Sequence, residues 1–324
     1  MDYPGIIPLE AIRAARERLA GGALRTPLVP LNLPDAPAEI YLKLENLQPV
    51  GSFKLRGAGN ALHAAGEDRL RRGVWTASTG NMAMAVAWYA RRLGAACTVV
   101  VPDTASELKL DAIRSLGGDV LKVPWSTYFE AQITWQHEGM DGLFVHPFAA
   151  PEVIAGNGTI ALEILEDLPD VEAILVSYGG GGLSGGIGSA LRALKPNVRL
   201  IACEVETGAP LGPSLAKGEP VTVPHSPSFV DAIGSPRVFE QMWLLSQQLI
   251  DDSLAIGLAE AAEAIRLLVE RNHVVAEGAG ALPVAAALSG QAGGGKVVCV
   301  VSGGNIDRNK LLAVLRGDIP QTGL

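Results

Sequence analysis

Short apolar runs rich in β-branched residues alternate along this chain with longer segments in which apolar residues recur at helical spacing. The short runs predict strands at residues 40–45, 74–78, 97–101, 119–123, 143–146, 173–178, 200–205 and 296–301. The longer segments predict helices at residues 53–71, 81–93, 107–115, 151–167, 183–194 and 254–271. Such alternation is typical of α/β proteins, in which helices cover parallel sheets. Residues 207–235 are rich in Pro, Gly and Ser and predict a long irregular connection.

Composition and charge narrow the range of partners. The chain has 324 residues, 48% of them hydrophobic, and a net charge of −8. No run is rich in Lys and Arg, which argues against nucleic acid, and the longest apolar runs are too short to span a membrane. Residues 1–22 carry acidic residues and an amphipathic pattern rather than the features of a signal peptide, so we expect a cytoplasmic protein. Three cysteines lie in strand-like runs and are predicted to be buried residues rather than a disulfide or metal cluster: Cys97, Cys203 and Cys299.

One glycine-rich loop follows a predicted strand, where functional groups of such folds stand. It has four consecutive glycines, residues 179–182, at the predicted start of a helix. Bare N–H groups and a helix N-terminus together can bind a phosphate, although a tight turn is the plainer interpretation. The segment also fits the dinucleotide motif G-x-G-x-x-G through Gly180, Gly182 and Gly185, with the acid Glu204 about 20 residues further on. An NAD-dependent oxidoreductase is therefore an open alternative.

Two other loops and one lysine carry further polar groups. Ser78, Thr79 and Asn81 follow a strand and open a helix, where they can bind a carboxylate or serve as an ordinary N-cap. Ser302 follows the last predicted strand, and its hydroxyl can bond a ring nitrogen or simply belong to a turn. Lys54 lies in the stretch GSFKLRGAG, beside an aromatic ring and among glycines. Such surroundings suit an amine that must become a neutral nucleophile.

Together these features match the requirements of pyridoxal phosphate, which needs a lysine for its Schiff base and groups for its phosphate and ring. The sequence resembles the fold-type II pyridoxal-phosphate enzymes of the serine/threonine dehydratase and serine racemase family. The resemblance covers nearly the whole chain and rests on six segments in the family's order: LKLENLQPVGSFKLRGA, ASTGN, VHPFAAPEVIAGNGTIALEI, GGGGLSGG, EGAGA and SGGNID. The oxidoreductase alternative gives no role to the lysine segment or to SGGNID.

The resemblance implies an architecture. It predicts two α/β domains with parallel or mixed sheets and the cofactor in the cleft between them. The large domain would comprise residues 1–72 and 148–324, and the small inserted domain residues 73–147. The resemblance also implies closure of the small domain on the substrate carboxylate, and a homodimer.

The resemblance assigns roles to site residues as well. Lys54 would form the Schiff base and take the proton from Cα, and Phe53 would pack on the ring. Asn81 would bond the 3-hydroxyl of the ring, and Ser302 would face the ring nitrogen. The phosphate would be held by Gly179, Gly180, Gly181, Gly182 and Leu183. The substrate carboxylate would be bound by Ser78, Thr79 and Asn81, with Glu277 and Gly234 close to the site.

The residue opposite the ring nitrogen points to the reaction. A neutral hydroxyl there makes a weaker electron sink than a carboxylate, which favours prompt loss of a β leaving group over transamination. The resemblance thus implies an ammonia-lyase (dehydratase) that converts L-threonine, L-serine or a related β-hydroxy amino acid to a 2-oxo acid and ammonia. The alternatives are a hydroxyaspartate dehydratase and an amino-acid racemase such as a serine racemase. Racemisation ranks lower because Thr79, stiff at its branched Cβ, stands where racemases of the family have serine.

Three departures from the family pattern bear on function. Met82 stands where the family usually has histidine, which removes a polar group from the rim of the site. Glu204 matches the first ligand of the family's divalent-cation site, but Pro210 replaces the downstream acid, so a metal ion is an open question. Because the sequence ends soon after SGGNIDRNKLLAVLRG, we expect neither the regulatory domain of the biosynthetic dehydratases nor feedback inhibition by isoleucine.

Overall fold

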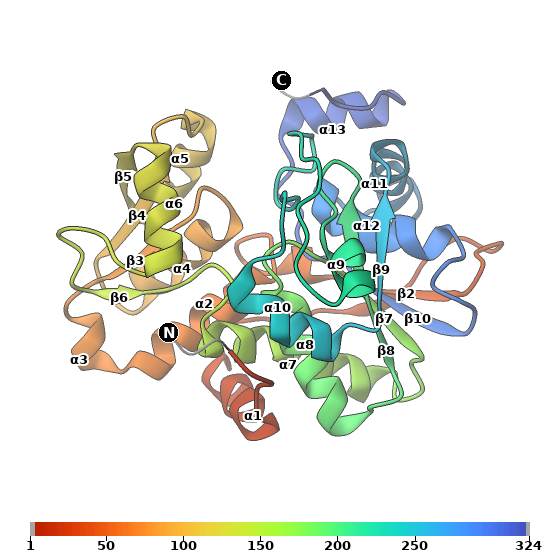
Figure 1. Ribbon diagram of the computed structural model, residues 1–324, viewed down its shortest axis with the longest axis horizontal. Helices are drawn as coiled ribbons and strands as arrows, with labels where there is room; N and C mark the ends of the chain where they lie inside the picture. The colour runs from red at the N-terminus through yellow and green to blue at the C-terminus, as the bar shows by residue number, and fades with distance from the viewer. Residues whose placement is uncertain (1–3, 322–324) are drawn as a thin grey trace.

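A computed structural model describes residues 4–321 of the chain, which form two sheets (Figure 1). The larger sheet has the strand order β1-β2-β10-β7-β8-β9, and the smaller has the order β5-β4-β3-β6. The strands are β1 Leu28–Pro30, β2 Glu39–Lys43, β3 Val74–Ala77, β4 Cys97–Pro102, β5 Asp119–Val123, β6 Leu143–Phe144, β7 Ala173–Ser177, β8 Arg199–Val205, β9 Asp252–Ile256 and β10 Lys296–Val300. The helices are α1 Leu9–Arg18, η1 Glu45–Leu47, α2 Lys54–Ala65, α3 Glu67–Leu70, α4 Asn81–Arg92, α5 Glu107–Ser115, α6 Trp125–Thr134, α7 Pro151–Asp167, α8 Gly182–Leu194, α9 Leu211–Lys217, α10 Glu240–Leu249, α11 Leu258–Asn272, α12 Gly278–Leu288 and α13 Arg308–Leu315. Of the N-terminal segment interpreted above, residues 1–3 lie outside the described part.

Strand pairing confirms the predicted α/β fold. Every pair in the smaller sheet is parallel. In the larger sheet only β1 runs antiparallel, beside β2 at the edge. The four strands of the smaller sheet all fall within residues 73–147. The division of the chain into two domains at these residues stays a prediction.

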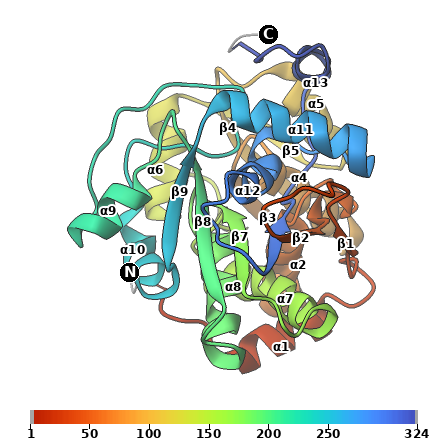
Figure 2. The ribbon, with the colours of Figure 1, turned by 90° about the vertical axis from the view of Figure 1, so that its right-hand side faces the viewer.

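Helices cover both faces of the larger sheet (Figure 2). α1, α7, α8 and α10 pack against one face, and α11 and α12 pack against the other. Ile174 and Val176 of β7 belong to the first core, whereas Ala173 and Leu175 belong to the second. Successive side chains of a strand point to opposite faces, so a strand buried on both sides has a continuous apolar sequence. That is why apolar and polar residues do not alternate in the sequences of the predicted strands.

Helix α2 joins the two sheets. It packs against α4, which covers the smaller sheet, and against α7, which covers the larger one. Leu55 and Leu62 of α2 share a core with Val86 of α4 and Val153 of α7. Lys54, the first residue of α2, is therefore attached to a helix that both parts of the fold hold in place.

Three predicted segments differ from the structure. The helix predicted at 53–71 is interrupted at Gly66, whose φ of 77° ends α2 before α3 begins. The helix predicted at 254–271 is wrong at its start, because residues 252–256 form β9 beside β8 and α11 follows Gly257. The region 207–235, predicted to be irregular, contains α9. The sequence analysis also left several elements unassigned: β1, α1, α6, α10, α12 and α13.

The structure also bears on the expectations about membrane spans and cysteines. Among residues 4–321, no helix is both long enough and apolar enough to cross a bilayer. The three cysteines are buried and free, as predicted.

A buried cluster of four charges fastens α2 to its neighbours. Arg56 of α2 contacts Glu45 at 2.8 Å and Glu163 of α7 at 2.6 Å. Lys43 at the end of β2 contacts the second oxygen of Glu163 at 2.5 Å. None of the four side chains is more than 6% exposed. Two cations thus face two anions, so no net charge is buried, and each carboxylate is needed to compensate the buried cations.

Replacing Glu163 by alanine should therefore destabilise the protein strongly. The change leaves Lys43 without its ion-pair partner and Arg56 with one of two, which costs about 3–5 kcal/mol of unfolding free energy. Urea denaturation followed by circular dichroism measures the loss. Glu166→Ala on the same helix is the matched control, because Glu166 is 45% exposed in its ion pairs with Arg16 and Arg25 and should cost about 1 kcal/mol or less. Equal losses in the two variants would contradict the assignment of a supporting role to the buried cluster.

Candidate active site

Three adjacent strands bring the predicted loops to one place. β10 lies between β2 and β7, and all three run parallel. The chain leaves β2 toward Lys54, β10 toward Ser302, and β7 toward the glycines at 179–182. Because carboxyl ends of parallel strands meet at one edge of a sheet, these three loops converge.

Backbone hydrogen bonds then join the segment before Lys54 to the loop after β10. Ser52 and Gly303 form an isolated antiparallel bridge. The Phe53 N–H donates to the Ser302 carbonyl at 2.9 Å, and the Gly304 N–H donates to the Gly51 carbonyl at 2.9 Å. The start of α2 and the loop of Ser302 are thus held side by side by main-chain contacts, independently of any side chain.

The surroundings of the Lys54 amine lower its pKa. Its Nζ donates to the Pro147 carbonyl at 2.6 Å and lies 5.2 Å from the centroid of the Phe53 ring. Burial lowers the pKa of Lys54 to about 8, although the charge of Glu277 opposes the shift. A considerable fraction of the amine is therefore neutral near pH 8, which a nucleophile or a base requires.

The glycine loop is a close-packed helix N-terminus. Gly181 is the N-cap of α8, with a left-handed φ of 82° that favours glycine. A Cβ at Gly180 would overlap the Phe148 ring, and a Cβ at Gly182 would lie 2.5 Å from the Phe148 carbonyl oxygen. The side chain of Leu183 is buried in the core, so only its backbone can face a ligand. The first N–H groups of α8 have no acceptor within the helix, and its dipole adds partial positive charge. The loop can therefore bind a phosphate.

Asn81 is oriented by two side chains, one at the start of α12 and one in the loop after β10. Its Nδ2 donates to Glu277 Oε1 at 2.8 Å, and its Oδ1 accepts from Asn305 Nδ2 at 2.8 Å. Asn305 also donates to the Val50 carbonyl at 2.8 Å. Burial raises the pKa of Glu277 to about 7. Asn305 was not predicted as a site residue, although it lies in the SGGNID segment on which the resemblance rests in part.

The loop before α4 borders open space. Gly80 is the N-cap of α4, and its N–H donates to Ser78 Oγ at 3.4 Å. A Cβ at Gly80 would meet no atom within 4 Å, while Ser78, Thr79 and Asn81 are each half-buried. A small anion can approach this helix start. Met82, in contrast, is 1% exposed and packs in the core of the smaller sheet. The expectation from the sequence that position 82 lies at the rim of the site is therefore wrong.

The carboxylate of Glu204 accepts three hydrogen bonds from its own chain. Its two oxygens accept hydrogen bonds from the Leu211 N–H at 2.9 Å, the Gly212 N–H at 3.1 Å and the Ser253 hydroxyl at 2.8 Å. The carboxylate therefore caps α9, whose N-cap is Pro210. Within residues 4–321, no group of three or more His, Cys, Asp or Glu side chains is placed to hold a metal ion.

The residues present fit pyridoxal phosphate. Lys54 supplies a buried amine, and the start of α8 supplies a phosphate cradle. Ser52 Oγ and Asn157 Oδ1 are buried without a hydrogen-bond partner among the described residues, and they flank these two features. Ser52 lies two residues before Lys54, and Asn157 donates its Nδ2 to the Gly182 carbonyl at 3.1 Å. Unpaired buried polar atoms are costly, and a polar ligand in the site can satisfy them.

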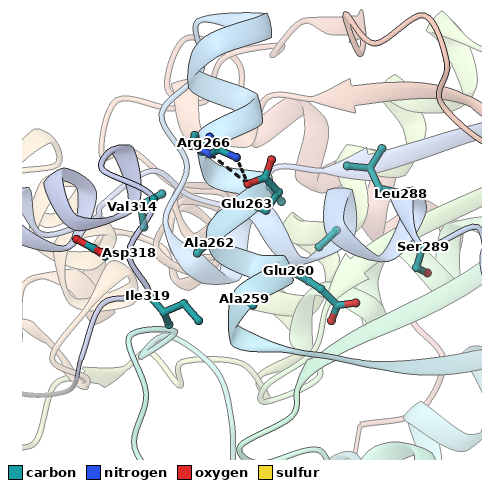
Figure 3. Close-up of a pocket in the computed structure, with 13 residues that line it drawn as sticks. Ala259, Glu260, Ala262, Glu263, Arg266, Leu288, Ser289, Val314, Asp318 and Ile319 are labelled. Atoms are coloured by element: carbon teal, nitrogen blue, oxygen red, sulfur yellow. Dashed lines mark hydrogen bonds and ion pairs between the residues drawn. The ribbon is translucent and has the colours of Figure 1, made fainter.

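A cavity of about 580 Å³ lies elsewhere, between α11, α12 and α13 (Figure 3). Its lining includes the apolar residues Ala262, Leu288 and Val314 and the ion pair between Glu263 and Arg266. It contains neither the lysine nor the glycine loop. We therefore assign the active site to the convergence of the three loops.

Comparisons with known proteins agree with this assignment. Residues 19–303 match the family described as "Pyridoxal-phosphate dependent enzyme". The chain is 39% identical over 323 residues to an L-threonine ammonia-lyase of Thermotoga maritima, covering 98% of this chain and 80% of that protein. It is 36% identical over 319 residues to the catabolic L-threonine dehydratase of Escherichia coli, covering 96% of each chain. The structure of maize serine racemase superposes with a TM-score of 0.88 at 29% identity, covering 96% of this chain and 97% of that one.

An alanine at Gly180 should weaken binding of the cofactor. The added methyl group overlaps the Phe148 ring, so the loop must move away from its packed position, which costs about 1–3 kcal/mol of stability. Fluorescence titration of the apoprotein with pyridoxal phosphate measures the dissociation constant, which should rise. Gly294→Ala is the matched control, because a Cβ there meets no atom within 4 Å. A Gly180→Ala protein that binds the cofactor as tightly as wild type would refute this role of the loop.

Proposed function

This chain belongs to the family of pyridoxal-phosphate-dependent enzymes, and we propose that it is an ammonia-lyase acting on L-threonine. L-Serine and related β-hydroxy amino acids are further proposed substrates, and the products are a 2-oxo acid and ammonia. The observation that carries the proposal is the buried Lys54 amine, bonded to the Pro147 carbonyl beside the start of α8. The relatives named L-threonine ammonia-lyase and L-threonine dehydratase support the choice of substrate.

Residues of the three loops would hold the cofactor. Phe53 would pack on the ring face, Asn81 would bond the 3-hydroxyl and Ser302 would face the ring nitrogen. The phosphate would be held by the backbone of Gly179, Gly180, Gly181, Gly182 and Leu183. When bound, the cofactor stabilises the negative charge that develops at Cα of the amino acid.

The chain itself supplies binding and proton transfer. The substrate carboxylate binds at the start of α4, where Ser78, Thr79 and Asn81 meet the helix dipole. Lys54 Nζ accepts the proton from Cα, a role that its lowered pKa of about 8 supports. Glu277, with its pKa raised to about 7, holds the Asn81 amide in one orientation.

Racemisation is the second candidate, and the similarity to maize serine racemase favours it. A racemase must return a proton to Cα from the second face, and Thr79 stands where racemases of the family have the serine for this step. The neutral hydroxyl of Ser302 favours early departure of the β-hydroxyl group over a long-lived carbanion. Elimination is therefore the main reaction in this proposal.

We also propose a cytoplasmic homodimer. Three free, buried cysteines fit a reducing compartment, and the acidic composition without a basic run fits a metabolic enzyme.

Purified protein with pyridoxal phosphate should release 2-oxo acid from L-threonine. Lys54→Ala should abolish this turnover, whereas Lys217→Ala, at a lysine that is 62% exposed, should leave it unchanged. Colorimetric 2-oxo acid detection and chiral chromatography, run on L-serine, L-threonine and 3-hydroxyaspartate with and without magnesium, measure both reactions. Turnover in Lys54→Ala would refute the role of the lysine, and faster formation of D-amino acid than of 2-oxo acid would establish the racemase instead.

The rate at which the apoprotein captures pyridoxal phosphate should depend on the pKa of Lys54. Only the neutral amine attacks, so the rate should rise about tenfold per pH unit below pH 8 and level off above it. An ordinary lysine would keep gaining reactivity to about pH 10.4. Stopped-flow absorbance after mixing gives the profile. A rate that still rises steeply above pH 9 would contradict a lowered pKa.

A further inference from the structure

A short turn between β6 and α7, residues 146–149, is organised by a histidine that has no role in the proposal above. His146 is fully buried. Its Nδ1 accepts two backbone hydrogen bonds, from the Phe148 N–H at 3.2 Å and the Ala149 N–H at 2.9 Å. A side chain that accepts from the N–H groups two and three residues ahead fixes the backbone of the turn between them.

The same contacts fix the tautomer of the ring. Two N–H groups point at Nδ1, so this nitrogen carries no proton and the hydrogen is on Nε2. Nε2 then donates to the Gln132 carbonyl of α6 at 3.1 Å, and the Gln241 amide of α10 lies 3.3 Å from the same nitrogen. Burial, helped by the nearby charge of Lys54, lowers the pKa of His146 to about 3, although the hydrogen bond to the Gln132 carbonyl opposes the shift. The ring is therefore neutral at physiological pH, and its Nδ1 remains a hydrogen-bond acceptor.

The turn contacts both halves of the candidate active site. The carbonyl of Pro147, inside the turn, accepts from Lys54 Nζ at 2.6 Å. The ring and carbonyl of Phe148, the next residue, fill the space that side chains at Gly180 and Gly182 would need. One turn of four residues thus sets the position of the amine relative to the glycine loop.

We propose that His146 is a positioning residue for cofactor binding. Its Nδ1 holds the turn that fixes the position of the Lys54 amine relative to the glycine loop. The inference rests on the proposed function, because it takes Lys54 as the lysine that binds pyridoxal phosphate. His146 touches neither substrate nor cofactor and acts through Pro147 and Phe148. An apolar residue of similar size can fill the core but cannot accept the two hydrogen bonds.

Two substitutions separate a hydrogen-bonding role from a packing role. His146→Leu keeps an apolar side chain and removes the acceptor, whereas His146→Asn keeps an acceptor that forms the same kind of local turn. His63→Leu is the matched control, since His63 lies on the same helix as Lys54 and is distant from the turn along the chain. The dissociation constant for pyridoxal phosphate is measured by fluorescence titration, together with the absorbance of the bound chromophore and the melting temperature of each apoprotein.

The expected result is a dissociation constant raised about tenfold or more in His146→Leu, from the loss of two hydrogen bonds. His146→Asn should recover most of the affinity, and His63→Leu should bind as wild type does. If His146→Leu binds pyridoxal phosphate with wild-type affinity, the inference is overturned and the proposed function is not affected. A wild-type protein that binds no pyridoxal phosphate would overturn the proposed function and, with it, the inference.

A second measurement needs no variant and covers the case in which His146→Leu does not fold. ¹⁵N NMR of histidine-labelled protein should show His146 with a proton on Nε2 and none on Nδ1, unchanged between about pH 5.5 and 8.5. A proton on Nδ1, or titration of His146 within this range, would overturn the inference.

Discussion

The pairing of β10 between β2 and β7 is the constraint on which the site depends. Because the three strands are parallel, the segments that follow them must meet at one edge of the sheet. The pairing continues past the strand ends as the bridge between Ser52 and Gly303. A slip of one residue would turn every side chain of β10 to the opposite face and displace the loop that carries Ser302. The register of a buried sheet thus places the amine, the hydroxyl and the phosphate loop together.

The buried Arg56 and the half-buried Lys54, both on α2, show how neighbouring groups determine whether a basic side chain keeps its charge. Arg56 faces the carboxylates of Glu45 and Glu163, which stabilise its charge. Lys54, two residues earlier, has a neutral carbonyl as its hydrogen-bond acceptor. Burial disfavours charge on both side chains, but only Arg56 has full compensation. The same helix therefore carries one cation that stays charged and anchors the fold, and one amine that can give up its proton.

The sequence allowed the parallel α/β fold and the three loops to be predicted, because both follow from local pattern. Apolar runs identify strands buried on both faces, and four consecutive glycines identify a helix N-terminus as a candidate phosphate site. Asn305 and His146 were not found, since their roles depend on contacts with residues far along the chain. Asn305 bonds Asn81, 224 residues away, and the turn of His146 meets Lys54, 93 residues before Pro147. The role of Glu204 as a helix cap was hidden because α9 itself was not predicted.

The turn that holds the amine also belongs to the smaller sheet. The Val145 N–H donates to the Trp75 carbonyl at 2.8 Å, and Thr76 Oγ1 donates to the Val145 carbonyl at 2.7 Å. Trp75 and Thr76 lie in β3, the strand that ends just before the loop at Ser78. Any displacement of β3 must therefore reach Val145 and the adjoining turn, because hydrogen-bonded strands move together. The Pro147 carbonyl in that turn accepts from Lys54 Nζ, so the position of the amine depends on the position of β3.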